Sequence, residues 1–285
     1  MTVDMPGPMT APGSHFVGYT GTAFSHALLL LWRRKHLLVL LVITLLPGLL
    51  PLLLWFFSGK ASHSGPKSFF NDMAFHVYLE NLVPLVSVFF GCSLVSEELD
   101  NRTIHHILTR PIPRSAWLLG RFMAFTTASF LSFAAGLGFL FGACALTGNI
   151  QAVSSNLMIL IHYIGITAFA LLPYTALCTF WGASMKKPMV LSLVVIIGWQ
   201  NLALLMPGVV DFLTIEKYIQ ELLPEGTVGN TQQSLALTIL EAQKQEYLVG
   251  TGWSIAALLF ITGLFMLLAI WMVRRREYAS ARFQQ

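Results

Sequence analysis

Six long runs of apolar residues, separated by short polar connections, dominate the pattern of this chain. Each run is about 20 residues or longer, which is the length of helix that crosses the ~30 Å hydrocarbon core of a bilayer. The runs are continuous rather than alternating, so they predict helices and not the strands of a membrane barrel. The predicted spans cover residues 37–57, 77–96, 122–146, 157–183, 188–210 and 253–273.

The composition supports an all-α integral membrane protein. Of the 285 residues, 55% are hydrophobic and 11% are charged, whereas a soluble domain carries about 25% charged residues. The mean hydropathy is +0.69. These values exclude a soluble enzyme and a secreted disulfide scaffold. Cys92, Cys144 and Cys178 lie far apart, each in an apolar run, and are predicted to be small buried hydrophobic residues.

The basic residues predict the orientation of the spans. Thirteen of the 17 Lys and Arg residues lie before the first span, after the second, after the fourth or after the sixth. The positive-inside rule places these segments and both termini in the cytoplasm, so we expect a multi-pass protein of the cell (inner or plasma) membrane. The net charge of +4 then reflects topology and does not indicate a nucleic-acid partner.

Three further segments are predicted on the cytoplasmic side. Residues 1–15 are expected to be disordered, residues 16–36 to form an amphipathic helix on the inner leaflet, and residues 274–285 to form a basic tail. The apolar face of the helix would comprise Phe24, Ala27, Leu28, Leu31 and Trp32, followed by the basic residues Arg33, Arg34 and Lys35. The alternative is a simple basic stop before the first span.

The connection after the second span predicts a short amphipathic helix over residues 97–109. Glu97, Glu98 and Asp100 occupy its first turn, where the helix dipole favours anions. Its apolar stripe consists of Leu99, Thr103, Ile104, Ile107 and Leu108, and Pro111 ends it. A helix with an apolar stripe and nothing of its own chain beneath it favours docking in a partner's groove.

This segment resembles the corresponding segment in permease subunits of ABC transporters of the export-type "type-2" family. The matching residues are Glu97-Glu98, Thr103, Ile107-Leu108, Pro111 to Arg114, and Gly120-Arg121. Two residues depart from the family pattern, because Arg102 stands where Gly is usual and Arg121 where Lys is common.

The resemblance implies that residues 97–109 form the coupling helix, which docks on a separate ATP-binding subunit. The residues implied in coupling are Glu97, Glu98, Thr103, Ile104, Ile107, Leu108, Arg110, Pro111 and Arg114. The implied assembly has two permease copies, expected as a homodimer, and two ATPase subunits. The chain has no GxxxxGK[ST] loop, so ATP and Mg²⁺ are expected on the partner and no cofactor on this chain. No catalytic or metal site is predicted.

Polar residues near the outer side suggest a second functional region. Asp72, His76 and Glu80 are spaced to share one helical face, and Glu80 is the only Asp, Glu, Lys or Arg within the six spans. An outer gate and a wetted helix end remain alternatives. The segment 211–250 predicts an outer helical loop that caps the exit path or merely covers the bundle. A ridge of small residues at Ala134, Gly138 and Gly142 indicates close packing within a protomer or between two.

Other function classes remain open beside the ABC permease subunit. They are an ATP-independent transporter or channel, a membrane-embedded enzyme, and a scaffold without transport. The central thirds of the spans carry no charge, which disfavours a secondary transporter. No HExxH or GxSxG motif supports an enzyme. Nothing in the pattern predicts the substrate.

Overall fold

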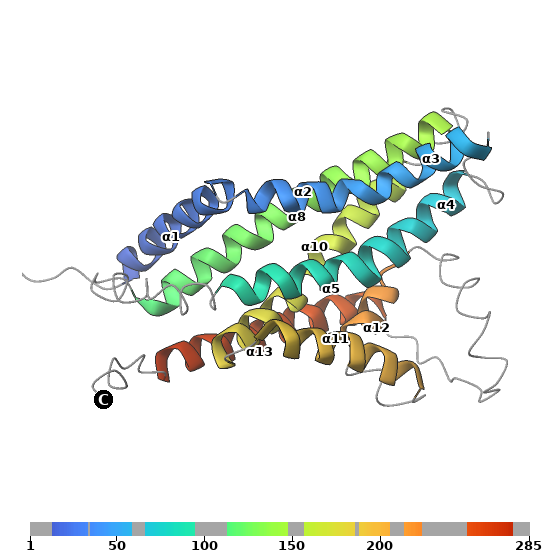
Figure 1. Cartoon of the computed structure of the whole chain (residues 1–285). Coiled ribbons are helices and arrows are strands. Elements are labelled where there is room, and N and C mark those ends of the chain that lie inside the picture. Colours follow the sequence, from blue (N-terminus) through green and yellow to red (C-terminus); the bar gives the residue numbers. More distant parts are fainter. Residues whose placement is uncertain are drawn as a thin grey trace, which may run out of the picture.

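The structure is a computed structural model that describes residues 13–33, 35–58, 66–94, 113–147, 157–185, 188–205, 214–223 and 250–275. Within these ranges every regular element is helical, as the apolar runs predict. The long helices run back and forth along one common direction and form an elongated bundle (Figure 1). The predicted α-helical class is therefore confirmed for the described segments.

Five of the six predicted spans appear as helices that are long and apolar enough to cross a membrane. They cover His36–Phe57, Lys67–Leu94, Arg114–Thr147, Leu157–Ser184 and Thr251–Arg275. The third is longer than predicted, because the helix already begins at Arg114 rather than at residue 122. The fifth predicted span, 188–210, coincides with helix α11 (Pro188–Leu205). This helix is not among the five, so a sixth crossing stays a prediction.

Proline shapes the first span, which consists of α2 (His36–Leu45), the 3₁₀ turn η1 (Leu46–Gly48) and α3 (Leu49–Ser58). Pro47 lies in the tighter turn. The carbonyl oxygen of Thr44, which precedes it, accepts a hydrogen bond of 2.7 Å from the Tyr78 hydroxyl of the second span. A neighbouring helix thus satisfies a polar backbone group near a proline, as membrane interiors require.

The second span is irregular along most of its length. It begins with α4 (Pro66–Asp72), continues through the π-helical segment η2 (Met73–Leu82) and α5 (Val83–Val86), and enters a second π-helical segment, η3 (Ser87–Gly91). Pro84 lies between the two wide segments and has no N–H to donate. In proteins, π-helical turns often occur at functional sites.

Two long helices form the centre of the bundle: α8 (Arg114–Thr147) and α10 (Leu157–Ser184). The first helix, α1 (Gly13–Arg33), and the first span pack along α8, whereas α13 (Thr251–Arg275) packs mainly against α10. Most of their buried residues form one large core, in which Tyr78, Tyr163, Phe125 and Phe133 are the largest side chains that are fully enclosed. A smaller cluster contains Phe122, Ala176 and Met266.

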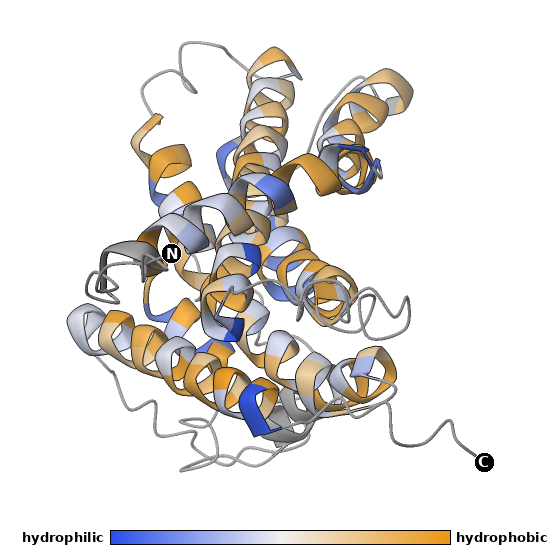
Figure 2. Ribbon diagram, turned by 90° about the vertical axis from the view of Figure 1, so that its left-hand side faces the viewer, coloured by the Kyte–Doolittle hydropathy of each residue, from blue (hydrophilic) through white to orange (hydrophobic). Residues whose placement is uncertain are grey.

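Many large hydrophobic side chains are exposed on the bundle, and apolar residues make up much of the long helices (Figure 2). The most apolar stretch of α13 has only 17% of its residues buried within the chain, and that of the first span has 28%. Exposure of such large apolar faces to water is unfavourable, so these faces are expected to contact lipid or another subunit.

Candidate functional site

The predicted coupling helix lies outside the described residues. This applies to Glu97, Glu98, Thr103, Ile104, Ile107, Leu108, Arg110 and Pro111, and also to Arg34. Their roles stay predictions. The two ends between which this segment runs are described: the second span is described to Leu94, and α8 begins at Arg114. Both ends lie at the same end of the bundle, where α13 also finishes (Figure 1).

Arg114, the one coupling residue that is described, contacts the end of the last span. Its Nη1 lies 3.5 Å from the carbonyl oxygen of Val273. In return, Nη2 of Arg274 lies 3.5 Å from the Ser115 hydroxyl. A cation beside the last carbonyls of a helix is favourable, because that end of the dipole is negative. The start of α8, which follows the predicted coupling helix in the sequence, therefore contacts the end of α13.

The same part of α8 also contacts α1 at very short range. A Cβ placed on Gly120 would lie 2.7 Å from both the carbonyl oxygen of Thr20 and Cβ of Ala23, and 2.9 Å from the Phe24 nitrogen. Only glycine permits this approach of two helices. The Gly120-Arg121 pair of the resemblance thus has a structural reason, since Gly120 holds α1 against the start of α8.

An elbow separates α1 from the first span. Lys35 adopts a left-handed backbone, with φ of 58°, so the helix ends at Arg33 and a new one begins at His36. The predicted interface helix, 16–36, is therefore displaced toward the N-terminus and starts at Gly13, within the segment expected to be disordered. The sequence pattern predicts a helix that continues to residue 36, and the left-handed backbone of Lys35 ends it earlier.

The predicted apolar face of α1 divides between two environments. Ala27 is buried, and Phe24 and Leu31 are half-buried, whereas Leu28 is 36% and Trp32 72% exposed. Arg33 and Lys35 are exposed as well. One edge of the stripe thus packs within the chain, and the other edge, with Trp32, is left uncovered next to the basic elbow.

The structure brings together two of the three predicted gate residues. Nδ1 of His76 lies 2.7 Å from Oε2 of Glu80, and the two side chains are 34% and 32% exposed. Both belong to the π-helical segment η2. The Asn81 side chain, through Nδ2, donates a hydrogen bond to the carbonyl oxygen of His76. Asp72 is exposed, and in the described part of the chain no hydrogen bond or ion pair joins it to His76. The cluster is therefore a pair.

The second and fourth spans cross at very short range, which no residue pattern predicts. A Cβ on Gly91 would lie 2.9 Å from Cys178 Cβ, and one on Gly182 would lie 2.8 Å from the Cys92 carbonyl oxygen. Cys178 lies beside Cys92 at this crossing, and the Ser192 hydroxyl of α11 lies 3.2 Å from Cys92 Sγ. All three cysteines are buried and free, as expected, but two of them meet.

Two further predictions concern packing. Gly138 and Gly142 of the small-residue ridge have open space around them in the described structure, so the ridge does not pack within this part of the protomer. On the outer side, α12 (Ile215–Gln220) lies within the predicted loop 211–250. His162 Nε2 lies 2.8 Å from the Leu222 carbonyl oxygen, just after α12, so this short helix is fixed to α10.

No group of three or more His, Cys, Asp or Glu side chains capable of holding a metal occurs among the residues that the structure describes. What the described site does offer is mechanical: the start of α8 connects α1, through Gly120, with the end of α13, through Arg114.

Comparison with known proteins identifies the family. Residues 29–199, from α1 into α11, match the family model described as ABC-2 family transporter protein. No curated protein matches the chain. The match covers more than half of the chain and includes the elbow, residues 97–109 and the first four candidate spans. This chain belongs to the ABC-2 family of transporter proteins and is a membrane permease of an ABC transporter, with the ABC ATPase partner that this family implies.

Proposed function

We propose that this permease takes its motion from a separate ATPase subunit through the segment 97–109. ATP and Mg²⁺ would bind to that partner, and the chain itself would supply the path across the membrane. Two copies of the permease, as a homodimer in the inner or plasma membrane, would work with two ATPase subunits, and the direction would be export.

The observation that carries the proposal is the set of contacts at the start of α8. Motion at the coupling segment would enter α8 near Arg114, because only residues 110–113 separate the segment from the start of this helix. There α8 contacts the end of α13 through Arg114 and the backbone of α1 through Gly120. A displacement of this one helix end would thus move three helices together, because packed interfaces shift as units rather than deform.

Reversal of charge at matched positions tests the proposal. Arg110→Glu alters the predicted coupling helix, and Lys67→Glu alters an exposed cation at the opposite end of the bundle. The complex is isolated from membranes with a tag on this chain, and the associated ATPase subunit and its activity are measured. We expect Arg110→Glu to lose the partner or its stimulation and Lys67→Glu to retain both. Equal behaviour of the two variants would refute coupling through this segment.

An ATP-independent transporter is the second candidate, favoured by one observation. His76 and Glu80 form an ionisable pair inside a π-helical stretch of a span, and ionisable residues in membranes often mark ion paths. Transport by proteoliposomes that contain this chain alone, without ATP, would support this candidate. Transport only with the ATPase subunit and ATP would exclude it.

A further inference from the structure

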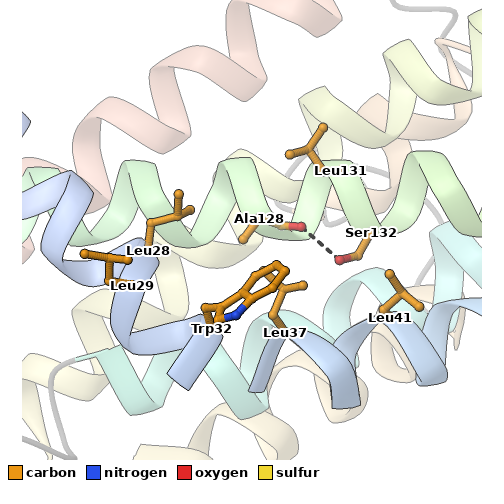
Figure 3. A pocket seen from close by; sticks show the side chains of 8 residues that line it. All are labelled: Leu28, Leu29, Trp32, Leu37, Leu41, Ala128, Leu131 and Ser132. Carbon is orange, nitrogen blue, oxygen red and sulfur yellow. Dashed lines mark hydrogen bonds between the residues drawn. The ribbon is translucent and has the colours of Figure 1, made fainter. Parts of the chain in front are cut away.

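An apolar groove of about 360 Å³ lies inside the elbow between α1 and the first span. This volume is within the range of ligand pockets, about 300–1,000 Å³. Its walls come from α1 and α2 and its floor from α8 (Figure 3). The side chains that define it are Leu28, Trp32, Leu37, Leu41, Leu131 and Ser132.

The groove follows from a mismatch in chain length between two contacts. The first segment touches α8 at Thr20, opposite Gly120, and again at Thr44, opposite Gly136. Between these contacts the first segment has 24 residues and α8 has 16. At about 1.5 Å per helical residue, the longer segment cannot lie flat along the shorter one. It bends outward at Lys35 and leaves a space above Ala128 and Ser132.

The lining selects a hydrocarbon chain. The one hydroxyl on the floor, that of Ser132, is already used, because it donates to the carbonyl oxygen of Ala128 at 3.0 Å (Figure 3). All other side chains around the space are aliphatic or, in Trp32, largely apolar. A polar ligand would lose its hydrogen bonds to water here and gain none. An acyl chain has no hydrogen bonds to lose on entering the groove.

Basic residues lie at the elbow, between Trp32 and Leu37 of the groove in the sequence. Arg33 and Lys35 are exposed at the elbow, with Arg34 between them in the sequence. Asp and Glu are absent from residues 5–71 and from 113–147, which include all three helices that line the groove. The other cations on these helices are Arg114 and Arg121 of α8. The charge around the elbow is therefore complementary to an anion.

The sequence around the elbow predicts a position at the depth of lipid headgroups. The first span starts at His36, directly after the basic residues. Trp32, which is 72% exposed, precedes them, and tryptophan is enriched at the membrane–water interface. The inner leaflet is negatively charged and attracts basic residues next to a span.

We propose that the elbow groove binds one anionic phospholipid of the inner leaflet, with an acyl chain over Leu131 and the phosphate on Arg33 and Lys35. The lipid fills the angle between α1 and α2, and so it sets the position of the helix that Gly120 joins to α8. This site does not depend on the mode of energy supply, because it concerns only the membrane and this chain.

Native mass spectrometry of the purified full chain tests the proposal with phosphatidylglycerol and phosphatidylcholine of identical acyl chains. We expect the wild type to retain one phosphatidylglycerol about tenfold more strongly than phosphatidylcholine. The double variant Arg33→Gln/Lys35→Gln should lose this preference, since each basic residue near the membrane surface contributes to anionic lipid binding. Leu131→Trp, which fills the groove, should lose retention of both lipids.

Matched controls lie elsewhere on the same elements. Leu146→Trp changes an exposed leucine at the far end of α8, and Arg275→Gln removes a cation at the end of α13, outside the groove. Both should bind lipid like the wild type. Equal retention of the two lipids by the wild type, or an unchanged preference in Arg33→Gln/Lys35→Gln, would overturn the proposal. So would a Leu131→Trp variant that alters the monomer–dimer ratio and keeps the lipid, because the groove would then be an interface between copies.

Discussion

The carbonyl oxygen of Thr20 lies 2.7 Å from the position that a Cβ of Gly120 would occupy. The backbones of α1 and α8 therefore touch at a point where any side chain would intrude. This contact joins α1 to α8, and so it decides whether the two helices move together.

Substitution of Gly120 by valine should separate α1 from α8. The added atoms would meet backbone on α1, which cannot move aside as a flexible side chain can, and such overpacking costs about 1–3 kcal/mol. We expect faster proteolysis of α1, a lower melting temperature in detergent, and loss of the coupling of ATPase activity to transport.

Gly138→Val is the matched control for this prediction. Gly138 lies on the same helix and has nothing within 4 Å of its Cβ position. It should leave α1 as resistant to protease as in the wild type. Similar cleavage of α1 in the two variants would mean that the Thr20 contact does not hold the helix.

The crossing of the second and fourth spans makes a similar prediction at Gly182. A Cβ there would lie 2.8 Å from the Cys92 carbonyl oxygen, so Gly182→Ala should destabilise the bundle by about 1–3 kcal/mol. Gly165→Ala, in the same helix but in open space, should not destabilise the bundle and should gain up to about 1 kcal/mol, because alanine is the better helix former. Denaturation of both purified variants in mixed micelles measures the difference, and equal stabilities would contradict the crossing.

The sequence predicts features that depend on neighbouring residues, and it does not predict those that depend on contacts between distant segments. Span positions follow from local apolar runs, and the first span from His36 to Phe57 agrees with its prediction within one residue. The helix from Arg114 starts eight residues earlier than its apolar run, because α1 and α13 cover its polar first turns. Length and hydropathy carry no information about such tertiary cover.

The sequence does not predict contacts between spans for the same reason. Cys92 and Cys178 meet because the two helices have particular rotations and a glycine on each side, and periodicity in an all-apolar helix does not define a face. The sequence does not predict the elbow at Lys35, because lysine has no residue preference for the left-handed backbone that it adopts here. The pairing of His76 with Glu80 was predictable, since residues four apart adjoin in a helix.

The hydrogen bond from Tyr78 to the Thr44 carbonyl predicts a measurable cost for the loss of one oxygen atom. Tyr78→Phe leaves a buried carbonyl without this donor near Pro47, which costs about 1–3 kcal/mol. Thr44→Val is the control, because it keeps the carbonyl and the volume and removes only a bond to the helix's own Leu41 carbonyl. Only Tyr78→Phe should lower the melting temperature markedly. The reverse order would show that the Thr44 side chain, and not its carbonyl, stabilises the kinked span.

The His76–Glu80 pair gives the sharpest test of an outer gate. Glu80→Ala removes the partner of His76, whereas Asp72→Ala removes an exposed carboxylate one turn earlier that has no such contact. Because the pair is only about two-thirds buried, its loss should cost no more than about 1 kcal/mol of stability. If the pair gates the exit, Glu80→Ala should change the transport rate in proteoliposomes that contain the complete complex, at unchanged ATPase association, and Asp72→Ala should not. Identical transport by both variants would assign His76 and Glu80 to a wetted helix end, whose ion pair serves only the local fold.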